Sequence, residues 1–161
     1  MLSAPLLVAL ALATGILAFA AVRHFAVPDL ETAVAELADG DLDGPERAAM
    51  LRVVVDRAAA GSTPRELWAG WLAAIALDDA PAADRLRQQL GGGRFPTVVP
   101  PPAARRFLDL GDPVLANFAA GAFAEAANDH PAAVVFWRRV VAEGRLAPRP
   151  LATALAQAAL Q

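Results

Sequence analysis

Several residue types that carry chemistry are missing or rare in this chain of 161 residues. Cysteine is absent, which excludes disulfides, thiolate nucleophiles, haem attachment and zinc ribbons. The two histidines, His24 and His130, lie too far apart in the sequence to suggest a metal cluster. The only serines, Ser3 and Ser62, are not in a nucleophile elbow, so Ser-His-Asp hydrolysis is not expected. The sequence therefore predicts no enzyme, no catalytic residue, no cofactor and no metal centre of the usual kinds.

Lysine is also absent, so all fourteen basic residues are arginine, which we interpret as the codon bias of a GC-rich bacterial genome. The net charge is −3 and the charges are scattered. A basic stripe is the usual mark of a nucleic-acid-binding protein, so no nucleic acid is expected as a partner. Hydrophobic residues make up 57% of the chain, and because much of this share is alanine the composition favours an all-α fold.

A long apolar run occupies residues 2–22, LSAPLLVALALATGILAFAAV, with seventeen apolar residues in twenty-one and no charge. A helix of this length spans roughly 31 Å, close to the ~30 Å hydrocarbon core of a bilayer. The run therefore predicts a single-pass anchor, residues 1–23, in the inner (cytoplasmic) membrane. Arg23 on its C-terminal side favours a cytoplasmic over a periplasmic position for the rest of the chain.

Two alternatives to the anchor stay open. Ala18-Phe19-Ala20 resembles a signal-peptidase site, although the start MLSAP lacks the basic region of a secretory signal. A buried helix of a soluble fold is the third reading of the same run.

Helix boundaries are marked by prolines that follow a small or polar residue and by glycines that close segments. Thr63 and Glu66 match a capping box, and Asp112 and Asp129 are placed as N-caps. Glycines 40, 61, 91, 111 and 144 are expected to end helices in the left-handed conformation. No alternating strand pattern occurs. The expected helices are 29–39, 45–60, 64–78, 81–90, 103–110, 113–128, 131–143 and 148–160.

An internal repeat appears when residues 78–90, DDAPAADRLRQQL, are laid on residues 128–140, NDHPAAVVFWRRV, at an offset of fifty positions. Trp68 then falls on Phe118. The Gly/Pro-rich segment 91–102 between the copies, GGGRFPTVVPPP, lacks the Gly-Lys-Ser/Thr ending of a phosphate-binding loop. We interpret it as a linker between helix pairs, with recognition of a polyproline II segment by an aromatic groove as the alternative.

Gly121, Asn128-Asp129, Ala133 and Trp137 resemble the tetratricopeptide-repeat (TPR) pattern of a small residue, a turn, an alanine and a large aromatic. HPAAVVFWRRVVAEG also resembles, more weakly, repeats in membrane-anchored cytochrome c maturation factors. The resemblance implies antiparallel helix pairs over residues 45–161, after a juxtamembrane segment and first helix in 24–44. It also implies that the protein binds another polypeptide, as scaffold, assembly factor or accessory subunit of a membrane complex.

Five residues are the candidates for partner contact. In a TPR-like layout the inner helices line a concave groove, and the resemblance places these side chains there: Trp68, Leu72, Phe118, Ala122 and Glu125. For Trp68 and Trp71, three positions apart on one helix face, an aromatic core between packed helices is the competing interpretation.

The stretch DGDLDG matches half of a calcium loop. Asp39, Asp41 and Asp43 occupy loop positions 1, 3 and 5 of an EF-hand, but Glu46 and Met50 stand where the template has an apolar residue and a bidentate glutamate. Three carboxylates ahead of Pro45 also suit the positive end of a helix. We expect a helix-capping turn, with an exported helical domain carrying a weak calcium site as the alternative.

One measurement, the melting temperature with and without calcium, distinguishes these two interpretations of DGDLDG. A capping turn predicts that the melting temperature of the protein is the same with calcium as with a chelator. A site that binds calcium only in the folded state would raise the melting temperature with calcium concentration.

Overall fold

The computed structural model describes residues 44–61, 63–102 and 111–161. These ranges contain no strand, which confirms the predicted all-α class. None of their helices is both long and apolar enough to span a bilayer. The predicted anchor at 2–22 and the expected helices 29–39 and 103–110 lie outside the described residues. The described helices are α3 (Gly44–Ala60), α4 (Pro64–Ala76), α5 (Ala80–Gln89), α6 (Pro113–Ala126), α7 (His130–Glu143) and α8 (Pro150–Ala159).

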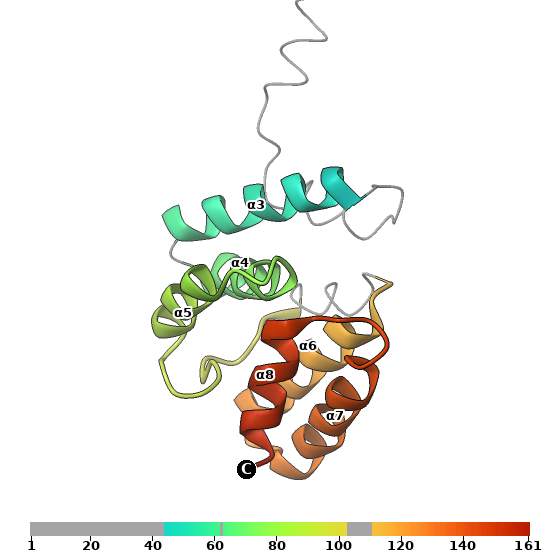
Figure 1. The fold of residues 1–161 in the computed structure, drawn as a ribbon. Helices are drawn as coiled ribbons and strands as arrows, with labels where there is room; N and C mark the ends of the chain where they lie inside the picture. The colour runs from blue at the N-terminus through green and yellow to red at the C-terminus, as the bar shows by residue number, and fades with distance from the viewer. Residues whose placement is uncertain (1–43, 62, 103–110) are drawn as a thin grey trace, which may run out of the picture.

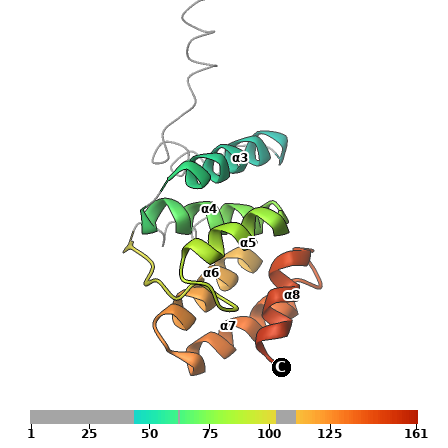
Figure 2. The ribbon, with the colours of Figure 1, turned by 90° about the vertical axis from the view of Figure 1, so that its left-hand side faces the viewer.

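The helices form a stack of neighbouring pairs. Helix α3 packs along α4, α4 pairs with α5, and α6 pairs with α7 (Figure 1). Helix α8 packs on α7 and also reaches α6 and α4. Figure 2 shows α3 at one end of the stack, α4 and α5 in the middle, and α6, α7 and α8 at the other end. The core runs through the middle of this stack, where α4 is buried along nearly its whole length.

The predicted helix starts follow from local chemistry. Thr63 and Glu66 form the predicted capping box, in which each side chain accepts a hydrogen bond from the other residue's backbone N–H. The Asp112 carboxylate accepts from Val114 N and Leu115 N at 3.0 and 3.1 Å, and so begins α6 as predicted. These caps satisfy backbone donors that the first turn leaves unpaired.

Helix α8 begins two residues later than predicted, at Pro150 and not at Pro148. Arg149 is its N-cap residue, with φ −130° and ψ 81°. The proline ring clashes with the backbone of the residue before it, which disfavours the helical region there. Arg149 precedes Pro150 and takes angles outside the helical region, so the helix begins after it.

The prediction of left-handed glycines is correct at two positions and wrong at two. Gly91 and Gly111 have φ of 101° and 67°. Gly144 is right-handed with φ −61°, and Gly61 is also outside the left-handed region. Gly40 lies outside the described residues.

Among the described residues, two that are not glycine take the left-handed conformation, which the sequence analysis did not predict. They are Asp78 and Asn128, with φ of 55° and 59°, one in each of the two repeated turns. Aspartate and asparagine tolerate this region better than other residues that carry a Cβ.

The turn after α4 and the turn after α6 have the same backbone hydrogen bonds. Asp79 N donates to Ala74 O at 2.9 Å, and fifty positions later Asp129 N donates to Ala124 O at 2.8 Å. Each aspartate side chain then caps the following helix. The internal repeat found in the sequence is therefore also a structural repeat. Each copy consists of a helix, a turn and a second helix.

The segment 91–102 is built into the core along its first half. Phe95 and Pro96 are buried, and the Phe95 ring stacks on Trp137 at 4.6 Å between centroids. Thr97 N and Val98 N both donate to Leu90 O, at 3.1 and 3.2 Å. The segment is a linker between helix pairs, as predicted, but one that supplies a core side chain.

Replacing Phe95 by alanine tests this role. We expect Phe95→Ala to lower the free energy of unfolding by roughly 3–5 kcal/mol, because it leaves a cavity between aromatic rings. Val99→Ala in the same segment removes a side chain that is 69% exposed and is expected to change stability by less than about 0.5 kcal/mol. Urea unfolding followed by tryptophan fluorescence measures both, and equal effects would contradict the role given to Phe95.

Candidate functional site

The structure places four of the five predicted partner-contact residues inside the protein. Trp68, Leu72, Phe118 and Ala122 are all buried. The indole Nε1 of Trp68 donates to Val98 O at 3.0 Å, so even its polar atom is used within the chain. In this conformation these four side chains have no surface to offer to a partner.

Trp68 and Phe118 belong to an aromatic cluster that joins the two halves of the stack. Edge, tilted and stacked ring contacts with centroids 4.6–6.3 Å apart run from α4 through α6 to α7. Such pairs contribute specific attraction in addition to the apolar area they bury. The structure thus agrees with the aromatic-core interpretation. The members of the cluster are Trp68, Trp71, Phe95, Phe118, Phe123 and Trp137.

Glu125 is the fifth predicted residue and the only one of the five that reaches the surface. Its side chain is 18% exposed. One carboxylate oxygen accepts from Trp137 Nε1 at 3.3 Å, and the other lies 2.8 Å from Nδ1 of His130. Glu125 therefore ties the end of α6 to α7.

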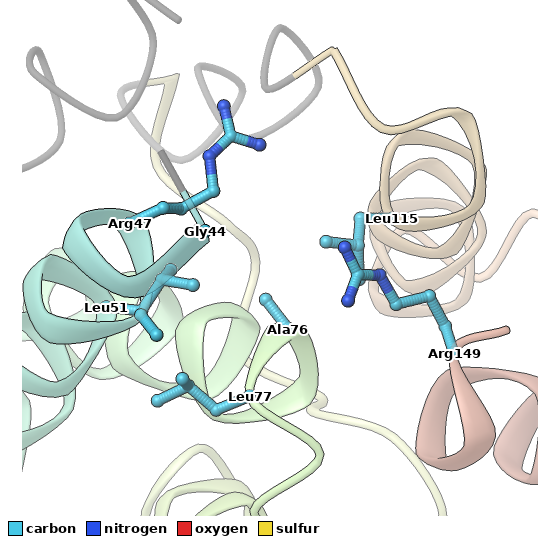
Figure 3. Close-up of a pocket in the computed structure, with 8 residues that line it drawn as sticks. Gly44, Arg47, Leu51, Ala76, Leu77, Leu115 and Arg149 are labelled. Carbon is cyan, nitrogen blue, oxygen red and sulfur yellow. The ribbon is translucent and has the colours of Figure 1, made fainter. Parts of the chain in front are cut away.

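A pocket at the junction of the two halves of the stack is the first candidate site (Figure 3). It has a volume of about 180 Å³ and opens between α3, α4, α6 and the start of α8. Leu51, Leu77 and Ala76 lie on one side of it, and Leu115 and Arg149 on the other. We call it the junction pocket. It is lined by Gly44, Arg47, Ala48, Leu51, Ala76, Leu77, Leu115 and Arg149.

The junction pocket combines an apolar wall with cationic side chains. Arg149 is held by Asp112, whose Oδ2 lies 2.8 Å from Nε and 2.7 Å from Nη2 of the guanidinium. Arg47 comes from the first turn of α3. A wall of aliphatic carbon next to guanidinium groups suits a side chain or chain end that is both apolar and negatively charged.

The size of the junction pocket indicates the kind of ligand. Pockets for small molecules usually enclose roughly 300–1,000 Å³. At about 180 Å³ the junction pocket is smaller than that and matches one or two side chains of a polypeptide.

A second hollow lies between α5 and α8, with a volume of about 300 Å³. Its lining is mostly apolar, and its charged members, Asp84 and Arg87, form an ion pair with each other. Asp78 holds the start of α8 by accepting from Leu151 N at 2.9 Å. Arg94 donates to Ala158 O near the end of α8. The hollow is lined by Trp71, Ala80, Ala83, Asp84, Arg87, Leu151 and Leu155.

Sequence reasoning did not find the junction pocket. Leu51 and Leu115 lie in the expected helices 45–60 and 113–128, but the sequence does not show that these helices leave a space between them. The signal closest to it was Asp112, read as a helix cap; its pairing with Arg149, thirty-seven positions away, comes from the packing of α6 against α8.

Within residues 44–61, 63–102 and 111–161 no three histidine or acidic side chains are grouped so as to hold a metal ion. Asp39, Asp41 and Asp43 lie outside the described residues, so the calcium alternative stays a prediction.

Comparison with known proteins adds no identification. No protein-family model matches this chain, and no curated protein or solved structure matches it significantly.

The double role of Asp112, as cap of α6 and as partner of Arg149, gives a stability prediction. Asp112→Ala removes both interactions, whereas Asp129→Ala removes a helix cap on α7. We expect Asp129→Ala to cost roughly 1 kcal/mol, and Asp112→Ala about 1 kcal/mol more because the ion pair is partly buried. Asp112→Asn retains a capping oxygen and should fall between them. Thermal or urea unfolding gives the order, and equal losses for the two alanine variants would show that the Arg149 pair contributes nothing.

Proposed function

We propose that this protein is a membrane-anchored polypeptide-binding module. It would act as a scaffold, assembly factor or accessory subunit of a membrane complex, with residues 2–22 as the anchor. On this proposal the helical domain recognises a partner chain and performs no chemistry.

The observation that carries the proposal is the repeated helix pair. Helices α4 and α5 and helices α6 and α7 are joined by turns with the same hydrogen bonds, fifty residues apart. Stacked helix pairs of this kind are the unit of solenoid proteins, whose extended surfaces bind polypeptides. The TPR resemblance of residues 113–148 points to the same class of function.

The contact surface that we assign to the partner is the junction pocket. Its small volume and its mixed lining favour an acidic residue next to an apolar one in the partner chain. The residues first considered for this contact, Trp68, Leu72, Phe118 and Ala122, are buried in the core and do not line the pocket.

Anchoring supplies much of the strength of such an interaction. When the module and its partner share one membrane, the second contact is made at a high effective concentration. A pocket that binds a free peptide weakly can then hold a partner stably. The prediction from Arg23 puts this contact on the cytoplasmic side.

Site-specific photo-crosslinking in native membranes tests the assignment. Gly44 lines the junction pocket, and a Cβ at this position would have no described atom within 4 Å. We expect a photo-reactive phenylalanine derivative at Gly44 to give one discrete protein adduct, and the same group at Ala60, at the other end of α3, to give none.

A pair of charge reversals tests whether the Gly44 adduct depends on the junction pocket or on the charge of α3 as a whole. Arg47→Glu should reduce the Gly44 adduct about tenfold or more, because it repels an acidic partner side chain. Arg52→Glu makes the same change on the same helix outside the pocket lining and should leave the adduct intact. Loss of the adduct in both variants, or no adduct with any of them, would contradict binding at this pocket.

A further inference from the structure

Helix α7 has an outer face opposite the side that it buries. Ala133, Trp137 and Val140 point into the core, and the residues on the other side of the helix are exposed. The turn that follows α7 continues this exposed surface. We call it the α7 outer face, and it consists of Val135, Arg138, Arg139, Ala142, Arg145 and Leu146.

The α7 outer face carries positive charge that the described part of the chain does not neutralise. Arg138 and Arg145 make no hydrogen bond or ion pair with a described residue, and Arg139 has only a ring contact, 5.8 Å from the centroid of Phe136. The nearest acidic residue along the helix is Glu143, whose carboxylate accepts from Asn117 Nδ2 at 2.8 Å and so faces α6.

The same face exposes large apolar side chains. Leu146 is 90% exposed and Val135 is 49% exposed. Leu146 projects from an ordered turn, because Leu146 N and Ala147 N both donate to Glu143 O, at 2.9 and 3.0 Å. These bonds fix the backbone of the turn, so Leu146 is presented at a defined place on the surface.

We propose that the α7 outer face docks on the surface of an anionic lipid bilayer. Anionic headgroups are attracted to juxtamembrane arginines, and apolar side chains among them enter the interfacial region. Charge complementarity therefore favours this occupant. A protein partner would need a cavity that fits the protruding Leu146. A bilayer needs no preformed cavity to take up a protruding side chain.

This docking would act in addition to the polypeptide contact at the junction pocket and does not depend on it. Helix α7 lies at the opposite end of the stack from α3 (Figures 1 and 2). Docking through α7 would turn that end of the stack toward the membrane, with α3 at the far end and the junction pocket between them.

The absence of cysteine makes a direct test possible. Leu146→Cys in the full chain provides a single thiol for an environment-sensitive fluorophore. The labelled protein is placed in vesicles of phosphatidylcholine alone or with phosphatidylglycerol added. We expect a blue shift of the emission that requires phosphatidylglycerol, and no shift for a fluorophore at the exposed Gln89→Cys on α5.

Two matched charge reversals complete the test. Arg138→Glu/Arg139→Glu should lower the ratio of docked to free protein at least roughly tenfold, given the attraction of each arginine to an anionic surface. Arg52→Glu/Arg85→Glu changes the net charge by the same amount at two exposed positions on α3 and α5 and should leave the shift unchanged.

Three results would overturn the proposal. The first is no phosphatidylglycerol-dependent shift at position 146. The second is an equal loss in both charge-reversed pairs, which would mean that net charge alone attracts the protein. The third is a shift produced by an acidic polypeptide such as polyglutamate but not by the anionic vesicles, which would make the face a protein-binding surface.

Discussion

The aromatic cluster between α4, α6 and α7 is the interaction on which the rest of the structure depends. Few backbone contacts join the α4–α5 pair to the α6–α7 pair, so large side chains must bridge them. Phe95 completes the bridge from a segment outside the helices, and its ring contacts both Phe118 and Trp137. Close packing of rings needs room for them, and Gly121 provides it, since a Cβ there would lie 2.7 Å from the Trp137 ring. The relative position of the two halves, and with it the junction pocket, is thus set by core aromatics.

Much of the fold could be predicted from the sequence because its boundaries depend on neighbouring residues. The Thr63–Glu66 box and the Asp112 cap act over three positions, so short-range patterns identify them. The start of α8 was missed although the signal was present, in the restriction that Pro150 imposes on Arg149. The role of Phe95 was not predictable, because nothing near it in the chain distinguishes a phenylalanine in a linker from one in a core. The candidate site shows the same limit: the helices that line it were predicted, but the space between them was not.

The burial of the candidate residues Trp68 and Phe118 has one physical reason. In a large solenoid an inner helix can expose aromatics in a concave groove, because neighbouring repeats bury the rest of its surface. The described residues contain two repeated pairs, and α3 and α8 cover helices that a longer array would leave open. Trp68 and Phe118 are therefore part of the core. Charged side chains lie next to small apolar surfaces elsewhere, at Arg149 and Leu115 in the junction pocket and at Arg145 and Leu146 on the α7 outer face.

The central claim is that the protein works as a membrane-bound member of a complex. The measurement that tests it most directly is purification from the native membrane in mild detergent, with mass spectrometry of the co-eluting proteins and of the protein's own N-terminus. The account predicts a chain that retains Met1 and elutes in a fixed ratio with other membrane proteins. A chain that begins near Ala21 and elutes alone from the soluble fraction would contradict both the anchor and the partner.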